Sequence, residues 1–196
     1  MLALQHRSRQ LAVRAATLQL LMRLWSTVDA TRLAATIQPF ADAAATVVTD
    51  GYLRSARTAA AYYLLTRPRG ITTVTVPEVA PPAPELTAAK LRAAALSGIL
   101  NGRRAGQTIE AATANGFVKL SGTASSIILE GGRDTIIEAA RQDPAATGRW
   151  VRVAGANACA FCQSRVAEGP VYSDDTAQFA AHDHCGCAVE PEFESR

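Results

Sequence analysis

Residues 67–85 read RPRGITTVTVPEVAPPAPE, and this stretch divides the chain into two parts. It contains five prolines: Pro68, Pro77, Pro81, Pro82 and Pro84. Prolines cannot continue a helix and favour extended backbone. A segment of this length without regular structure is uncommon inside one compact domain. We therefore expect an N-terminal α-helical hairpin over 1–66, a Pro-rich linker over 67–86 and a second module after the linker.

The part before the linker has the pattern of two long helices. Apolar side chains recur on one helical face in residues 2–25, and a second helical stretch follows over about 30–65. A proline inside a helix removes one hydrogen bond, so Pro39 predicts a kink or break near Gln38. His6 is expected on the surface, near the start of the first helix.

The part after the linker begins with three further helical stretches. We expect helices over about 88–100, 104–114 and 122–142, which together form the helical part of a domain over 87–144. The predicted ends are Asn101-Gly102, Asn115-Gly116 and Asp143-Pro144.

The last segment, 145–196, differs from the helical part because it contains short stretches in which apolar and polar residues alternate. Short strands are expected at 149–153, 171–172 and 188–189, with Pro191 closing the last one. Three short strands bury too little apolar surface to order themselves, so this segment needs another source of stability. The predicted fold class is mainly α (α+β), ending in a small Cys/His-rich β knuckle stapled by zinc.

Composition limits the function classes. The chain has 196 residues, 48% of them hydrophobic and 19% charged, which is typical of a globular protein. No stretch of apolar residues reaches the length of a membrane span, so we expect no membrane partner. The first residues also lack the apolar run of a signal peptide.

Charge is unevenly distributed along the chain. The net charge is +3, but residues 1–70 hold nine arginines against three aspartates, and residues 143–196 hold four arginines against eight acids. The basic front half could meet an acidic protein surface or make non-specific contact with nucleic acid. No aromatic residues are interleaved with these arginines, so specific readout of nucleic acid is poorly supported.

All four cysteines lie in the last 40 residues. They form a Cys-x-x-Cys pair and a Cys-x-Cys pair with two histidines beside it, and the candidates are Cys159, Cys162, His182, His184, Cys185 and Cys187. Without a secretion signal, clustered cysteines bind metal more often than they form disulfides. A Cys-x-x-Cys turn is the usual half of a tetrahedral zinc site. We predict structural zinc on Cys159, Cys162 and Cys185, with His182 or Cys187 as the fourth ligand.

Catalytic motifs are weak by comparison. The order of motifs in zinc deaminases, the His-Glu-x-x-His of metalloproteases and a P-loop are all missing from the sequence. A Ser-His-Asp set can be assembled only on paper, from Ser164 or Ser173 with His182 and a nearby aspartate. We therefore predict no catalytic residues.

Several tail motifs resemble one known family. Cys159-Ala160-Phe161-Cys162, Gly169-Pro170-Val171-Tyr172 and the spacing His182-x-x-Cys185-x-Cys187 resemble the carboxyl module of MuF-like minor head proteins of tailed phages. The family often has Pro-Asn where this chain has Asp183-His184, and Arg where it has Gly186. The similarity covers roughly residues 87–193. The front half resembles proteins encoded beside the portal in phages of actinobacteria.

The resemblance implies two functions. One is a minor capsid protein, active in head morphogenesis, that binds the portal protein or the major capsid protein in several copies of a ring-like assembly. Its expected location is the portal region of the phage head in the virion, after assembly in the host cytoplasm. The other is a capsid maturation protease. Because the residues offer no credible protease constellation, we favour the structural role, with a DNA-binding zinc protein as a weaker alternative.

Overall fold

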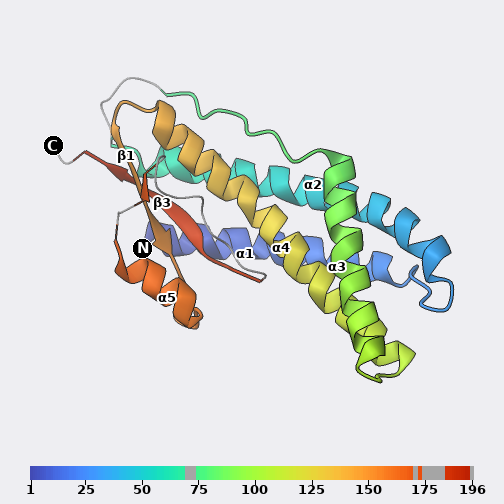
Figure 1. Cartoon of the computed structure of the whole chain (residues 1–196). Coiled ribbons are helices and arrows are strands. Elements are labelled where there is room, and N and C mark those ends of the chain that lie inside the picture. Colours follow the sequence, from blue (N-terminus) through green and yellow to red (C-terminus); the bar gives the residue numbers. More distant parts are fainter. Residues whose placement is uncertain (69–73, 170–171, 174–183, 195–196) are drawn as a thin grey trace.

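A computed structural model shows a helical bundle with a small sheet at one end (Figure 1). It describes residues 1–68, 74–169, 172–173 and 184–194. The helices are α1 (Leu2–Trp25), α2 (Leu33–Thr66), α3 (Pro84–Arg104), α4 (Ile109–Gln142) and α5 (Ala160–Ala167), and the strands are β1 (Ala146–Val153), β2 (Tyr172–Ser173) and β3 (Ala188–Phe193). The predicted fold class, mainly α with a small β element, is confirmed.

The three long helices run along one another, and α3 crosses α4 at the end of the bundle away from the sheet (Figure 1). The core at that end contains side chains from all four helices: Leu21, Phe40, Val48, Leu91, Leu120 and Ile128. Helices from both sides of the Pro-rich linker therefore share one core. The division into domains stays a prediction. Separate expression of residues 1–66 and 87–196 would test whether either part folds without this shared core.

A second core joins the sheet to the helices. Trp150 of β1 and Val189 of β3 are buried against Tyr63 of α2 and Ile136 of α4. The sequence predicted that the tail buries too little apolar surface to order itself. In its described residues, one face of the sheet is buried by packing on the helices of the bundle, so the helices supply part of the stability that the tail needs.

The sheet has the antiparallel order β2-β1-β3. Trp150 in the central strand is opposite Tyr172 on one side and Pro191 on the other. Pro191 therefore lies within β3 and does not close it. Proline is compatible with this place because β3 is an edge strand. Edge strands tolerate a residue that has no backbone N–H to donate. Val171 lies outside the described residues.

One predicted helix break is wrong: residues 109–142 form one helix, so Asn115-Gly116 does not separate two helices. Near Gln38 we predicted a kink or a break, and α2 continues without a break past Pro39, so the kink stays a prediction. Helix α4 begins at Thr108, whose Oγ1 accepts a hydrogen bond from the Ala111 N–H at 3.2 Å, in the usual manner of an N-cap.

The glycines after the linker have a packing role instead. A Cβ on Gly98 would lie 2.5 Å from the Asn115 carbonyl oxygen, and one on Gly116 would lie 2.5 Å from Ile99 Cγ1. These residues let α3 and α4 approach closely. Helix α3 starts earlier than predicted because Pro84 takes its first turn, where a proline costs no hydrogen bond, and it continues past Asn101-Gly102.

In the described part of the chain, no helix has the length and apolar character needed to cross a membrane.

Candidate metal centre

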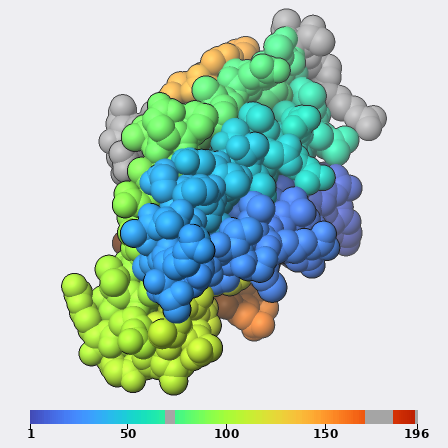
Figure 2. All heavy atoms as spheres, turned by 90° about the vertical axis from the view of Figure 1, so that its right-hand side faces the viewer, coloured from blue at the N-terminus to red at the C-terminus, as the bar shows by residue number. Residues whose placement is uncertain are grey.

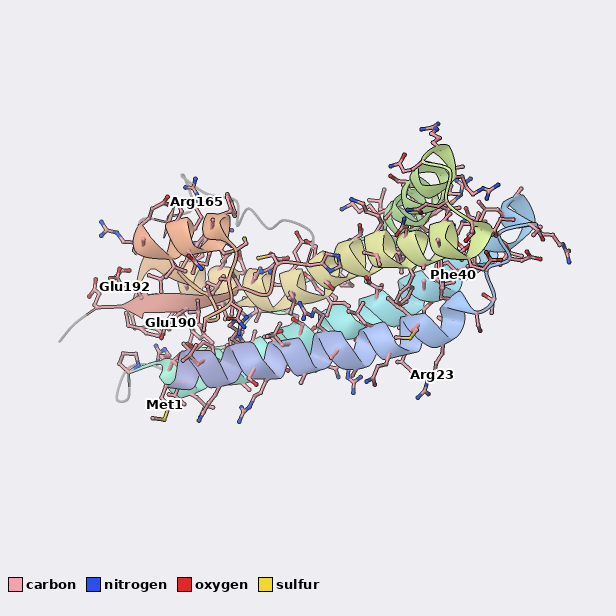
Figure 3. The ribbon with its side chains drawn as sticks, turned by 90° about the horizontal axis from the view of Figure 1, so that it is seen from below. Met1, Arg23, Phe40, Arg165, Glu190 and Glu192 are labelled. Atoms are coloured by element: carbon pink, nitrogen blue, oxygen red, sulfur yellow. The ribbon has the colours of Figure 1, made fainter. Side chains whose placement is uncertain are left out.

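Three buried cysteines meet where α5 and the chain before β3 come together beside β1. The Sγ atoms of Cys162, Cys185 and Cys187 all lie within 4.8 Å of one another, and we call these three residues the sulfur cluster. Their exposed fractions are 2%, 1% and 4%. Figure 3 shows α5 and β3 together at the end of the molecule that carries Met1, far from Arg23 at the other end of α1.

Local structure explains why these cysteines converge. Cys159 is the N-cap of α5 and Cys162 lies in its first turn, so the Cys-x-x-Cys spacing becomes one helical turn. Cys185 and Cys187 are two residues apart in an extended segment that leads into β3. The segment is preceded by His184 in the left-handed backbone region, at φ 63°, which sets the direction of the chain just before the cluster.

The predicted ligands fall into three groups. Cys162, Cys185 and Cys187 form the cluster. Cys159 is exposed and is not part of it, but it lines the same cleft. His184 also lines this cleft, whereas His182 lies outside the described residues. All four cysteines are free thiols, with no disulfide among them.

Two buried arginines lie beside the sulfur cluster. Arg133 of α4 donates hydrogen bonds to the Cys187 carbonyl at 3.2 and 3.1 Å and to the Cys185 carbonyl at 3.3 Å. Arg152 of β1 donates to Cys185 Sγ at 3.9 Å. Both residues are almost fully buried, at 4% and 3% exposure. Arg133 therefore fixes the backbone that carries two cysteines, and Arg152 favours a negative charge on one of them.

The ionisation of the cluster follows from these contacts. A hydrogen bond with the Cys187 thiol is the largest cause that lowers the pKa of Cys185, to about 4, and the Arg133 guanidinium acts in the same direction. The same hydrogen bond raises the pKa of Cys187, and burial raises the pKa of Cys162. These contacts favour the thiolate form of Cys185, and the thiolate is the form of cysteine that binds metal.

The geometry suits a metal with thiolate ligands. Zn–S bonds of about 2.3 Å in a tetrahedron place neighbouring sulfurs about 3.8 Å apart. The Cys162 and Cys185 sulfurs are 3.8 Å apart. Soft thiolates in a tetrahedral arrangement are typical of zinc and of iron–sulfur clusters. Three buried cysteines whose sulfurs lie within 4.8 Å of one another can hold a metal ion.

The arginines were not found from the sequence. Arg152 shares one face of β1 with Trp150, and the alternation in Arg149-Trp150-Val151-Arg152-Val153 could have placed it toward the interior. Nothing near Arg133 distinguishes it from an exposed residue of a long helix.

The prediction that His6 lies on the surface is wrong. This side chain is 3% exposed and stacks on the Tyr62 ring at 4.2 Å between centroids, because the sheet covers the start of α1.

The structure does not test the candidate Ser-His-Asp triad that the sequence analysis considered and rejected. Ser164 is an exposed residue of α5, while Asp174, His182 and Asp183 lie outside the described residues.

These features define a class: a mainly helical protein whose small terminal sheet carries a buried sulfur cluster. Comparison with known families is more specific. The family model described as VG15 protein matches residues 2–196, so the chain belongs to the VG15 family. This assigns the chain to a family of viral, phage-type proteins. No curated protein and no solved structure matches the chain.

Proposed function

We propose that this chain is a minor head protein of a tailed phage that binds the portal or the capsid interior during head assembly. It acts as a structural protein and not as an enzyme, in several copies arranged around a ring. Membership of the VG15 family across almost the whole chain supports the phage origin. The motifs shared with MuF-like proteins, described above, support the role in the head.

The burial of the sulfur cluster is the observation that carries the structural role. A catalytic metal needs an open coordination position that substrate or water can reach, whereas structural sites are closed. Here three ligands are at most 4% exposed, and Arg133 holds the backbone of two of them. A metal in this place links α5 to the segment before β3 and stiffens the end of the molecule.

The metal we infer is zinc, with Cys159 as its fourth ligand. Cys159 lies one helical turn from Cys162 and lines the cleft next to the cluster. An exposed N-cap side chain can change rotamer at little cost, so its sulfur can complete a tetrahedron. His184 is the competing donor from the described residues of the cleft.

Cobalt substitution tests this ligand set. The full-length protein loaded with Co²⁺ should show thiolate-to-metal charge transfer and the visible bands of a tetrahedral site. Cys159→Ser should reduce the charge-transfer intensity by about a quarter, since one of four thiolates is lost. His184→Ala, the matched control from the same cleft, should leave the spectrum unchanged. Loss of intensity in His184→Ala with none in Cys159→Ser would contradict the Cys₄ assignment.

The partner surface we propose is the free end of the α3–α4 hairpin. Figure 2 shows that this end projects from the body of the molecule below the turn between α1 and α2. It carries both apolar and basic exposed side chains: Leu100, Arg103, Arg104, Ile109, Val118 and Lys119. Apolar side chains exposed together with positive charge are typical of surfaces that bind other proteins.

Co-sedimentation with purified portal rings and with procapsids tests the proposed role. The chain should sediment with one of the two, and Arg103→Glu with Arg104→Glu should weaken this binding at least tenfold. A control pair on other surfaces, Arg32→Glu with Arg149→Glu, changes the net charge equally and should bind as the wild type does. A chain that stays unbound beside both assemblies, or that loses binding equally in the two variants, contradicts the proposal.

A further inference from the structure

Two arginines of α1 reach the cleft of the sulfur cluster. Arg7 and Arg14 are two helical turns apart, so they lie on the same face of α1. Both line the cleft that also contains the sulfur cluster and Cys159. Arg7 and Arg14 are separated from these cysteines by more than 140 residues of sequence, so this contact is tertiary.

The two guanidinium groups are held close to the chain around the cluster. A Cβ built on Gly155 would lie 2.7 Å from both terminal nitrogens of Arg7, so this group rests directly on the backbone of Gly155. A Cβ on Gly186, between two cysteines of the cluster, would lie 3.5 Å from Arg7 Nη2 and 3.6 Å from Arg14 Nη1. Both arginines therefore touch the segment that supplies two sulfurs.

Neither arginine has an acidic partner that the structure shows. In the described ranges, no carboxylate forms a salt bridge with Arg7 or Arg14, and the buried Nε atom of each has no hydrogen-bond partner there. Partly buried positive charges are costly unless a negative charge lies nearby. Among the described residues that line this cleft, the groups that can carry negative charge are the cysteine sulfurs.

We propose that Arg7 and Arg14 are the counter-charges of a metal–thiolate centre, and that this centre fastens the first half of α1 to the terminal sheet. The inference rests on the proposed metal centre. A Zn²⁺ ion with four thiolates has a net charge of −2, and the guanidinium groups of Arg7 and Arg14 at the cleft add positive charge from α1 to that of the buried Arg133 and Arg152. Loss of the ion removes the metal–thiolate centre that holds the two guanidinium groups at the cleft, so the first half of α1 is then attached less firmly to the terminal sheet. The metal state of the tail thus controls the order of a helix at the other end of the sequence.

The experiment measures zinc affinity by competition with a chromophoric chelator. Arg7→Gln with Arg14→Gln should bind zinc about 10–100-fold more weakly, as expected when outer partners of metal ligands are removed. Arg9→Gln, an exposed arginine of the same helix, is the matched control and should change affinity less than about twofold. Arg7→Lys with Arg14→Lys keeps both charges and should restore most of the affinity.

A second variant moves one guanidinium without removing its charge. Gly155→Ala places a Cβ where Arg7 now lies, so the side chain must shift away from the cluster. It should weaken zinc binding in the same direction as Arg7→Gln. It should add little to Arg7→Gln, because the contact it disturbs is already gone.

Hydrogen exchange reads the attachment of α1 directly. Removal of zinc from the full-length wild type should speed amide exchange in residues 2–14, while the buried middle of α2 stays protected. Wild-type affinity in the Gln double variant, or unchanged exchange in 2–14 after zinc removal, overturns the inference. A wild-type chain that binds no zinc in the first titration overturns the proposed metal centre instead, so the two failures are distinguishable.

Discussion

Asp143 is the residue at which the ends of α2 and α4 meet. Arg67 Nε donates to its Oδ2 at 2.6 Å, Arg67 Nη2 donates to Oδ1 at 3.0 Å, and the Tyr63 hydroxyl donates to Oδ2 at 3.1 Å. The Asp143 side chain is fully buried. These bonds, with the Arg67 guanidinium first among them, hold the pKa of this carboxyl below its usual range.

Asp143→Asn should therefore destabilise the protein strongly, because it leaves the Arg67 guanidinium without its charge partner. Urea unfolding should show a clear fall in the midpoint. Glu138→Gln breaks the exposed pair with Arg141 and should shift the midpoint much less. Equal shifts in the two variants would show that the Asp143 contacts add nothing beyond a surface pair.

His6 makes stability depend on pH. Burial, and to a smaller degree Arg9, lowers the pKa of this imidazole to about 4. The unfolded chain binds the proton at a pKa near 6.5, so stability is complete above that pH and decreases as the pH falls toward 4. The loss between pH 7 and pH 4 is about 3 kcal/mol.

His6→Phe keeps a ring against Tyr62 and removes the titration. The difference in unfolding free energy between wild type and variant should grow in favour of the variant as the pH falls from 7 to 4. Asp134, whose pKa burial raises to about 6, acts in the opposite direction in both proteins and cancels in the difference. A difference that does not change with pH would refute the buried neutral state of His6.

At the scale of elements, the crossing of α3 and α4 is one of the close contacts of the bundle. Gly98 lies directly against the backbone of Asn115 and Gly116, which cannot move aside as a flexible side chain can. Gly98→Ala should therefore cost about 1–3 kcal/mol through overpacking, although alanine is the better helix former. Ser97→Ala, at the exposed neighbouring position, should change thermal stability little. Stabilisation by Gly98→Ala would mean that the helices do not approach this closely.

The same crossing shows where prediction from the sequence stops. Apolar periodicity predicted the long helices because each of them buries one face. A glycine looks the same in the sequence whether it ends a helix or lets a neighbouring helix approach closely. For this reason the sequence analysis predicted a helix end at Gly116. Helix α5 was missed because its eight residues contain only one buried side chain, Cys162, and so show no apolar face.

The candidate site divides in the same way. The spacing of the cysteines is local, and it predicted that Cys162 and Cys185 belong to one site. The arginines around them come from α1, α4 and β1, so their roles depend on how distant segments pack. Only the alternation in β1 gives a local indication, for Arg152, and no such pattern marks Arg7, Arg14 or Arg133.

For the whole molecule, the two ends of the bundle are stabilised differently. The end near α3 has an apolar core from four helices, in which Trp25 packs edge-on against Phe40. The other end combines an apolar core around Trp150 with the sulfur cluster on the adjacent part of the sheet. The metal should therefore stabilise only one end.

The two tryptophans of the chain can report the two ends separately. In Trp25→Phe, chelation of zinc should shift the emission of Trp150 to longer wavelength, because the sheet that buries it loosens. In Trp150→Phe, the emission of Trp25 should stay unchanged by the same treatment. A shift of both, or of Trp25 alone, would contradict a metal that acts locally on the terminal sheet.

Elemental analysis of the full-length protein, purified without chelators, is the most direct test of the central claim. We predict one zinc ion per chain, with loss of this zinc in Cys162→Ser and its retention in the exposed control Ser164→Ala. Less than about half an equivalent of any transition metal in the wild-type protein would contradict a structural metal centre.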